Sequence, residues 1–241
     1  MSDFMKLREL EAARKPDPAL DLEIDEAEMC DRYARTYTGA INDVLREHLL
    51  MDQALPHDIR PLLPDRTIAG VAFTIRSATD PSVDLDGEMQ QRAQLLESIP
   101  RNAICVWDTN REDVASHWGG MMTASVKKRG VRGAIVDGGI RDTAQILGED
   151  FQVFYRYRSS NGLLGRSSIV AHQVPITLGG VHVFPGDVIV ADIDGAIVVP
   201  RRIARTVLER TEAIMAFETD IKIWVDSGES PTSIVRKGGY F

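Results

Sequence analysis

Residues 103–142 carry the pattern that decides the fold: AICVWDTNREDVASHWGGMMTASVKKRGVRGAIVDGGIRD. Short apolar runs at 103–107 and 133–137 predict two buried strands. Between them, residues 117–129 have the spacing of an amphipathic helix, and Gly130 follows as a typical helix terminator. This alternation of strand, helix and strand predicts an α/β fold in which both strands belong to one sheet.

The flanking segments extend this alternation in both directions. Apolar periodicity, β-branched content and turn residues predict helices over 37–50, 88–98, 140–147 and 201–225, strands over 67–76 and 152–155, and a compact antiparallel β unit over 175–200. Thr38 is placed to cap the first of these helices, and Gly70 predicts a bend or bulge in its strand. The charged residues 1–36, interrupted by Pro16 and Pro18, predict a peripheral N-terminal arm.

Composition excludes several classes of protein. The 241 residues are 44% hydrophobic and 27% charged, as expected for one large domain or two at most. With 28 Lys and Arg against 36 Asp and Glu, the net charge is -8, which argues against nucleic acid as a partner. No apolar run approaches a membrane span and no secretory leader is visible, so we expect a cytoplasmic protein without membrane contact. Cys30 and Cys105 predict two reduced thiols rather than a disulfide or a zinc site.

Two glycine pairs, at 119–120 and 138–139, are expected to face the same end of the sheet, where ligands bind in open α/β folds. Backbone amides at a helix start there could hold a carboxylate. Arg141 offers a planar donor for carboxylate or enolate oxygens, and Asp142 offers a hard oxygen ligand for Mg²⁺ or Mn²⁺. The alternative is that Asp142 caps a helix, Arg141 forms a surface ion pair and the glycines merely make tight turns.

A longer ordered set of residues resembles one known family, the RraA-like (ribonuclease-activity-regulator-like) and 4-hydroxy-4-methyl-2-oxoglutarate aldolase family, over residues 37–230. The set comprises Trp118-Gly119, Asp137-Gly138, Arg141-Asp142, Pro175, Pro185-Gly186-Asp187, Ala191-Asp192 and Asp194-Gly195. The resemblance implies a three-layer β/β/α swivelling fold, with the catalytic domain at 37–241, assembled as a homotrimer or homohexamer with active sites at subunit interfaces. It also implies a class II pyruvate aldolase that depends on Mg²⁺ or Mn²⁺, acts on a 4-hydroxy-2-oxo acid or decarboxylates oxaloacetate, and passes through a pyruvate enolate.

The same resemblance implies individual roles. Arg141 would bind the pyruvyl group and stabilise the enolate, and Asp142 would hold the metal. The substrate carboxylate would be bound by backbone amides near Gly119, Gly120, Met121 and Met122. Glu218 would act in the neighbouring subunit's site, although it could instead be an exposed partner for Lys222 four residues on.

Gly120 departs from the family, whose active aldolases carry an acid at this position that helps to hold the metal's water. His117, Asp113, Glu112, Asp108 and Asp137 are candidates to compensate, although His117 could be a locally bonded histidine at a helix start. The departure also favours two alternatives. One is a non-catalytic regulator that binds ribonuclease E or another protein, and the other is an enzyme in which Gly120 makes room for a bulkier oxo acid.

Overall fold

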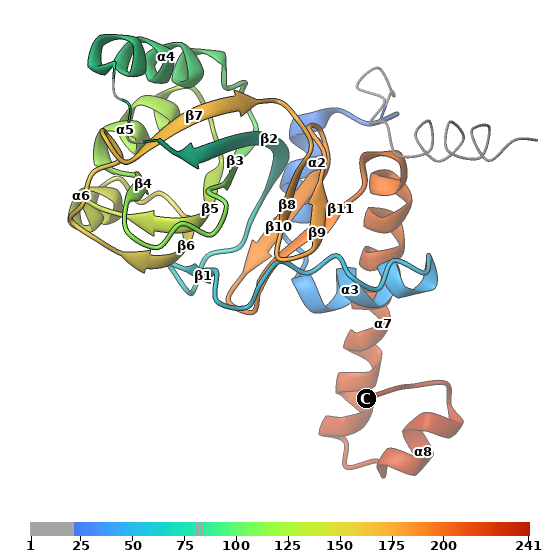
Figure 1. The fold of residues 1–241 in the computed structure, drawn as a ribbon. Coiled ribbons are helices and arrows are strands. Elements are labelled where there is room, and N and C mark those ends of the chain that lie inside the picture. Colours follow the sequence, from blue (N-terminus) through green and yellow to red (C-terminus); the bar gives the residue numbers. More distant parts are fainter. Residues whose placement is uncertain (1–21, 81, 83) are drawn as a thin grey trace, which may run out of the picture.

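The computed structural model describes residues 22–80, 82 and 84–241. A mixed sheet of nine strands forms the centre of this part of the chain (Figure 1). Its strands are β1 (Arg60–Pro61), β2 (Ile68–Thr79), β3 (Ala103–Asp108), β4 (Ser116–Trp118), β5 (Gly133–Ile140), β6 (Val153–Arg158), β7 (Ser167–His172), β10 (Val188–Asp192) and β11 (Gly195–Val199). The order is β1-β6-β5-β3-β2-β10-β11, with β4 beside β5 and β7 beside β2. Strands β2, β3, β5 and β6 pair in parallel, which confirms the expected α/β alternation.

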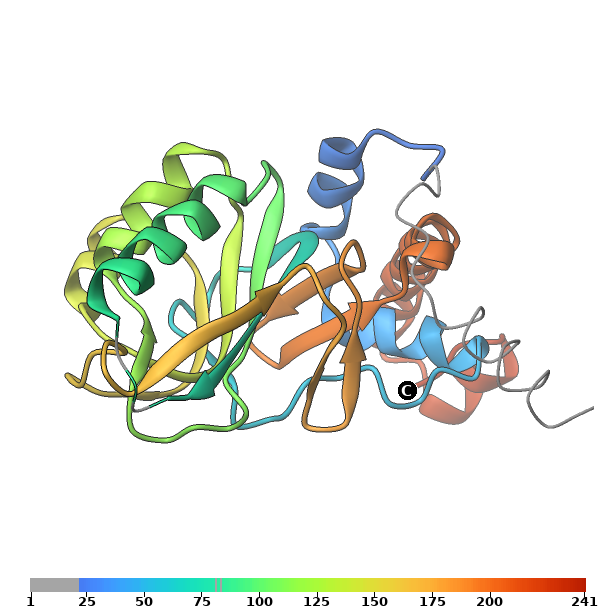
Figure 2. The same ribbon diagram turned by 45° about the horizontal axis from the view of Figure 1, so that its top comes forward.

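Three helices cover one face of the parallel strands: α4 (Leu85–Ser98), α5 (Gly120–Lys128) and α6 (Thr143–Gly148) (Figures 1 and 2). Alternate residues of β2 and β3 point to them because successive side chains of a strand face opposite sides. Phe73 and Trp107 are among the strand residues on this face, and they share a buried cluster with Leu95 and Val126 of the helices.

The other face of the same strands is covered by a hairpin of β8 (Ile176–Leu178) and β9 (Val181–Val183). The intervening strand residues, such as Ile104 and Val106, join Ile176 and Val183 in a second buried cluster. Hairpin, sheet and helices are the three layers of the expected β/β/α fold.

A further helical group packs on β10 and β11 at the end of the sheet (Figure 1). It consists of α2 (Glu26–Tyr33), α3 (Thr38–Glu47) and α7 (Ala204–Asp226), which follows the 3₁₀ turn η1 (Arg201–Ile203). The short helix α8 (Pro231–Arg236) comes after α7. Helix α2 falls within the expected peripheral arm, yet Met29, Cys30 and Tyr33 are fully buried. The first 21 residues of that arm lie outside the described residues, and the proposed division at residue 36 stays a prediction.

Two local expectations are wrong because distant residues decide the conformation. The side chain of Thr38 does not cap α3; instead the Asp192 carboxylate accepts hydrogen bonds from the Thr38 amide at 2.7 Å and from its hydroxyl at 2.9 Å. Gly70 does not bend β2, whose register shifts between Arg76 and Ser77 instead. A Cβ atom at Gly70 would lie 2.5 Å from the carbonyl oxygen of Asn102, so this glycine serves close packing of strands.

Candidate active site

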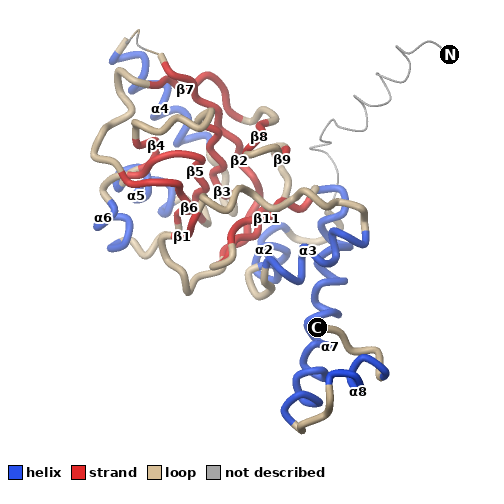
Figure 3. The backbone as a smooth tube through the Cα atoms, turned by 60° about the horizontal axis from the view of Figure 1, so that its bottom comes forward, coloured by secondary structure: helices blue, strands red, loops and turns tan. Residues whose placement is uncertain are grey.

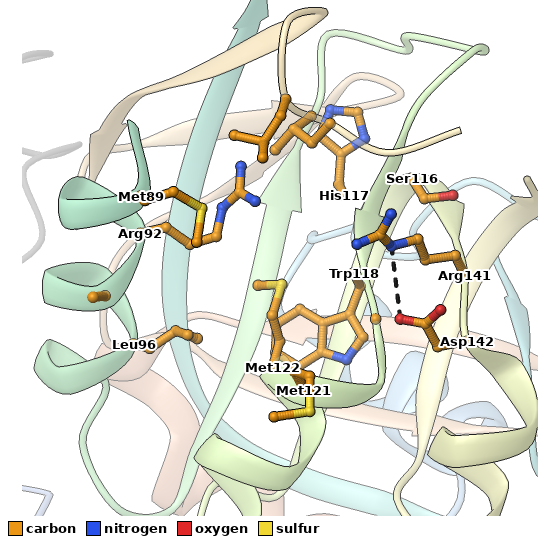
Figure 4. Close-up of a pocket in the computed structure, with 14 residues that line it drawn as sticks. Met89, Arg92, Leu96, Ser116, His117, Trp118, Met121, Met122, Arg141 and Asp142 are labelled. Atoms are coloured by element: carbon orange, nitrogen blue, oxygen red, sulfur yellow. Dashed lines mark ion pairs between the residues drawn. The ribbon is translucent and has the colours of Figure 1, made fainter. Parts of the chain in front are cut away.

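A pocket of about 370 Å³ lies between α4 and the ends of β4 and β5 (Figure 4). Because β4 and β5 are parallel neighbours, with Trp118 opposite Ile140, the residues that follow them meet at one edge of the sheet. Gly119 follows β4, and Arg141 and Asp142 follow β5, and all three line the pocket. The expected convergence of these two segments is therefore present, although residues 138–139 lie within β5 rather than in a turn.

Asp142 is held in an unusual conformation beside the start of α5. Its backbone has a φ of 55°, in the left-handed region that a non-glycine residue adopts at a cost of about 1–3 kcal/mol and that is enriched at functional sites. Its side chain makes no capping bond to α6. Instead, Oδ2 accepts a hydrogen bond from the Gly120 amide at 3.3 Å and lies 3.6 Å from Nε of Arg141. The alternative interpretation is therefore met in part: the Asp142 carboxylate accepts the first amide of α5 instead of capping α6, and its ion pair with Arg141, with side chains 49% and 37% exposed, lines the pocket (Figure 4).

The amino end of α5 is positioned to bind an anion. The side chain of Asp142 accepts the first amide of α5, that of Gly120, and the next two amides, those of Met121 and Met122, lie at the positive end of the helix dipole. The Gly120 amide is directed to Asp142, whereas Gly119, Met121 and Met122 line the pocket. A Cβ atom at Gly119 would lie 2.9 Å from Oδ2 of Asp142, so a side chain there would displace the carboxylate.

The space that an acid at position 120 would use is already filled. A Cβ atom at Gly120 would lie 2.1 Å from Oε1 and 2.8 Å from Cβ of Gln145, a residue of α6. The expectation that Gly120 makes room for a bulkier substrate is therefore wrong, because Gln145 occupies that room.

His117 is a buried strand residue rather than the helix-start residue that the sequence predicts. It lies on β4, it lines the pocket, and its side chain is 0% exposed. Neither ring nitrogen has a hydrogen-bond partner among the described residues. Burial lowers the pKa of His117 to about 4, although the negative charge of Glu112 opposes the shift. The imidazole is consequently neutral at physiological pH. Its Nδ1 lies 3.8 Å from Oε2 of Glu112, a residue outside the pocket.

Arg92 is a pocket residue that sequence reasoning missed. It extends from α4 into the pocket, opposite Arg141 (Figure 4). The only local signal is an arginine on a helix with few apolar residues, which does not reveal which face of the helix meets the sheet.

The remaining candidate acids lie elsewhere in the described chain, since none of them lines this pocket. The carboxylate of Glu112 accepts bonds from the amides of Val114 and Ala115. Burial raises the pKa of Asp137 to about 6, against the opposing charges of Arg111 and Arg156.

Glu218 also lies outside the pocket of the single chain. It is on α7, where its carboxylate accepts hydrogen bonds from the hydroxyls of Tyr37 and Tyr240. The expected alternative partner, Lys222, pairs with Asp226 instead. A role for Glu218 in a neighbouring subunit's site stays a prediction.

The donor set fits a weakly held magnesium-type ion. Among the described residues, no cluster of three or more His, Cys, Asp or Glu side chains could enclose a metal. Mg²⁺ keeps several waters and takes one or two carboxylates plus substrate oxygens, so a single exposed carboxylate such as Asp142 is compatible with it.

No helix in the described ranges is both long and apolar enough to cross a membrane.

These features define an α/β protein of β/β/α layering whose pocket is lined by two arginines, one carboxylate and the amino end of a helix. The chain belongs to the RraA-like family: the family model described as Aldolase/RraA matches residues 27–198. The match begins within α2, in agreement with the burial of that helix.

Two curated relatives are similar over much of this chain. Protein DlpA of Legionella pneumophila is 28% identical over 176 residues, which make up 71% of this chain but only 28% of that protein. A Halalkalibacterium halodurans protein, provisionally named as a 4-hydroxy-4-methyl-2-oxoglutarate aldolase, is 28% identical over 158 residues, covering 66% of this chain and 71% of that protein. This chain thus spans less than a third of the length of the Legionella relative.

Solved structures share the fold over nearly the whole chain. One, described as belonging to novel cellulases from microbes associated with the gut ecosystem, is 47% identical with a TM-score of 0.84, covering 89% of this chain and 96% of that chain. Another, from Streptomyces coelicolor, is described as an unusual member of the RNase ES inhibitor RraA protein family. It is 22% identical with a TM-score of 0.73, covers 87% of this chain and 99% of that chain, and shows the fold alone.

Proposed function

We propose that this chain is a divalent-metal-dependent carbon–carbon lyase of the class II pyruvate aldolase type, acting on a 2-oxo acid such as a 4-hydroxy-2-oxo acid or oxaloacetate. The observation that carries the proposal is the meeting of Arg141, Asp142 and the amino end of α5 in one pocket. The family and the provisional name of the Halalkalibacterium relative support it.

In this mechanism, the amides at the start of α5 bind the substrate carboxylate, and the Arg141 guanidinium donates to the neighbouring keto oxygen. Asp142 would hold Mg²⁺ or Mn²⁺, which supplies Lewis-acid polarisation of the keto group. When the bond between carbons 3 and 4 breaks, its electron pair becomes the pyruvate enolate. In a 4-hydroxy-2-oxo acid the carbon-4 fragment leaves as an aldehyde or ketone after its hydroxyl has given a proton to solvent, and in oxaloacetate it leaves as carbon dioxide. A proton from solvent then converts the enolate to pyruvate. Arg141 stabilises the negative oxygen of this enolate more strongly than the neutral ketone, which is the differential binding that accelerates a reaction.

The test is pyruvate release from purified protein, over a panel of 4-hydroxy-2-oxo acids and oxaloacetate, with Mg²⁺, with Mn²⁺ and with chelator. Asp142→Asn is the informative variant, because asparagine tolerates the left-handed backbone that Asp142 adopts. Metal-dependent turnover that Asp142→Asn abolishes and that the exposed-surface control Asp65→Asn retains is the expected result. Equal turnover with chelator would refute metal dependence.

Arg141→Lys tests the second role. Lysine keeps the charge but loses the planar pair of donors, so we expect turnover to fall about a hundredfold. The measurement is kcat at saturating metal, with Arg101→Gln as a matched arginine control outside the pocket. Near-normal kcat in Arg141→Lys would remove Arg141 from the reaction.

Glycoside hydrolysis, suggested by the description of the 47% identical structure, has less support. It generally requires two carboxyl groups about 5–10 Å apart on either side of the scissile bond. Among the described residues that line the pocket, Asp142 is the one carboxylate.

Non-catalytic regulation is the second candidate, and Gly120 favours it because binding another protein does not require the missing acid. The Streptomyces structure is described as a member of an RNase inhibitor family, although its likeness to this chain concerns the fold. Co-purification with ribonuclease E, together with a silent substrate panel, would shift the assignment to this function. Turnover without any such binding would exclude it.

A further inference from the structure

The guanidinium of Arg141 is held in place mainly by packing. The backbone of Arg141 is fixed, because its amide donates to the carbonyl of Trp118 at 3.0 Å. Its one ion pair among the described residues joins Nε to Oδ2 of Asp142 at 3.6 Å, which is longer than a hydrogen bond. The side chain is half exposed and extends beside Asp142 into the pocket (Figure 4). The surfaces against which it lies therefore decide where its planar donors point.

Two glycines provide such surfaces, one beside the stem of the arginine and one at its tip. A Cβ atom at Gly119 would lie 3.4 Å from Cγ and 3.7 Å from Nε of Arg141. A Cβ atom at Gly162 would lie 2.8 Å from Nη1 and 3.6 Å from Cζ. Real Cβ atoms essentially never approach another heavy atom within 3.0 Å. A side chain at position 162 would therefore have to displace the guanidinium.

Gly162 contacts Arg141 more selectively than Gly119 does. Apart from its chain neighbours, no described residue other than Arg141 has an atom within 4 Å of a Cβ at position 162. A Cβ at Gly119 would first meet the carboxylate of Asp142, at 2.9 Å. The φ angle of Gly162 is not positive, so alanine can adopt its backbone without strain. The reason for glycine at position 162 is therefore the close approach of the arginine, and not the backbone conformation.

The loop that carries Gly162 is anchored on both sides of the glycine. It follows β6, and Ser116 of β4 donates its hydroxyl to the carbonyl of Ser159 at 2.6 Å and its amide to the carbonyl of Asn161 at 2.8 Å. On the other side, Leu163 is 4% exposed and belongs to the buried cluster beneath the helices. Any added contact at position 162 must consequently be relieved by the exposed guanidinium, because the loop backbone is bonded and packed in place.

We propose that Gly162 is a positioning residue, whose backbone sets the Arg141 guanidinium in its working orientation before the substrate arrives. The identity of the oxygen that Arg141 stabilises rests on the proposed function, whereas the contact with Gly162 does not. A preorganised cation stabilises developing charge without rearranging during the reaction. A misplacement of about 1 Å in an active site can lower a rate about a hundredfold. Gly162 acts through Arg141 and does not itself touch the substrate.

Gly162→Ala tests this role because it adds one methyl group against the guanidinium. Crystal structures should show the guanidinium displaced and the loop backbone unchanged. Thermal melting temperatures should nearly coincide, since only the flexible end of an exposed side chain moves. In turnover assays kcat should fall about tenfold or more and KM should change less, because Arg141 stabilises the enolate more strongly than the ketone. The matched control is Gly148→Ala, whose added atom has no described atom within 4 Å and should leave all these values unchanged.

A double-mutant cycle shows whether Gly162 acts through Arg141. The side chain in Arg141→Lys ends one atom before the position of Nη1, so it leaves room for the added methyl group. We therefore expect Gly162→Ala to change kcat by less than about twofold in the Arg141→Lys background, which is the non-additivity of two residues in contact. Equal fold-changes in the two backgrounds, or an unmoved guanidinium in the variant structure, would overturn the proposal.

Oxalate binding separates this inference from the proposed function. Oxalate is an unreactive planar dianion that resembles the pyruvate enolate, and isothermal titration with Mg²⁺ present measures its affinity without turnover. Gly162→Ala should weaken oxalate binding about tenfold and pyruvate binding less, because the charged hydrogen bond to Arg141 is lost. If the substrate panel is silent but oxalate affinity depends on Gly162 through Arg141, the lyase assignment falls and the positioning role stands. If turnover is present and Gly162→Ala matches the wild type, the positioning role alone falls.

Discussion

At the scale of single residues, a neighbouring side chain fills the space beside position 120. Gln145 fills the volume beside Gly120, so Gly120→Asp alone would force Gln145 aside. We expect that single variant to lose about 1–3 kcal/mol of stability, as overpacked sites do. Gly120→Asp combined with Gln145→Gly, which removes the Cβ atom 2.8 Å away as well as the amide, should recover part of that stability. It should also tighten the apparent affinity for Mg²⁺ in turnover assays by about tenfold, because carboxylates near a metal orient its ligands.

The measurements are urea unfolding for stability and metal titration of pyruvate release. Gln145→Gly alone is the control: it should cost about 1 kcal/mol, as glycine does within a helix, and leave the metal affinity unchanged. Equal metal affinity in the double variant and the wild type would show that an acid at position 120 has no part in metal binding here.

His117 gives a pH dependence with a definite sign. The folded-state pKa is about 4, below the ordinary value of 6.5, so between these values the unfolded chain binds a proton that the folded chain does not. The neutral His117 therefore contributes its full stabilisation to the wild type above pH 6.5. Protonation of the unfolded chain at this residue should lower the free energy of unfolding by about 2–3 kcal/mol by pH 4.5. In His117→Gln the free energy of unfolding should not show that fall.

Urea unfolding at pH 7 and pH 4.5 measures the effect as a difference between the two proteins. Because Asp137 titrates in the opposite sense, with a pKa raised to about 6, the comparison with the variant isolates the histidine. His48→Gln, at an exposed position, should follow the wild type. Parallel losses in His117→Gln and the wild type would show that His117 is solvated or partnered in solution.

At the scale of elements, the amino end of α3 depends on a strand far away in the sequence. Asp192 of β10 accepts both the amide and the hydroxyl of Thr38, and it also accepts the amide of Asp194. Asp192→Asn should lower the free energy of unfolding by about 1–2 kcal/mol, because the helix loses a charged cap. The exposed neighbour Asp194→Asn should cost less, and equal urea midpoints for the two variants would contradict the capping role.

The elements that sequence predicts well are those whose signals are local. The apolar run at 103–107 and the periodicity of residues 201–225 identify β3 and α7 because each depends on its own side chains. The cap of α3 and the burial of Cys30 depend on contacts across long sequence separations, which no local pattern reveals. Arg141 and Asp142 were accessible through a motif, whereas Arg92 enters the site through the packing of α4 on the sheet.

At the scale of the whole molecule, the far end of α7 and the helix α8 project away from the sheet (Figure 3). Apolar side chains are exposed there, among them Ile223 at 59%, Val235 at 56% and Phe241 at 75%. Exposed apolar groups of this kind mark surfaces for association. The homotrimer or homohexamer that the family resemblance implies stays a prediction, for which light scattering should give three or six times the chain mass of 26.7 kDa.

Such an assembly makes the proposed role of Glu218 testable by complementation. If each site combines Asp142 of one subunit with Glu218 of the next, Asp142→Asn and Glu218→Gln chains are each inactive, yet a mixed assembly contains some sites with both groups intact. Random mixing of equal amounts should restore about a quarter of wild-type pyruvate release in a cyclic assembly. The two variants are unfolded together and refolded as a mixture, with each refolded alone as a control. If Glu218 serves only the hydroxyls of Tyr37 and Tyr240 within its own chain, mixing adds no activity beyond the average of the two separate variants.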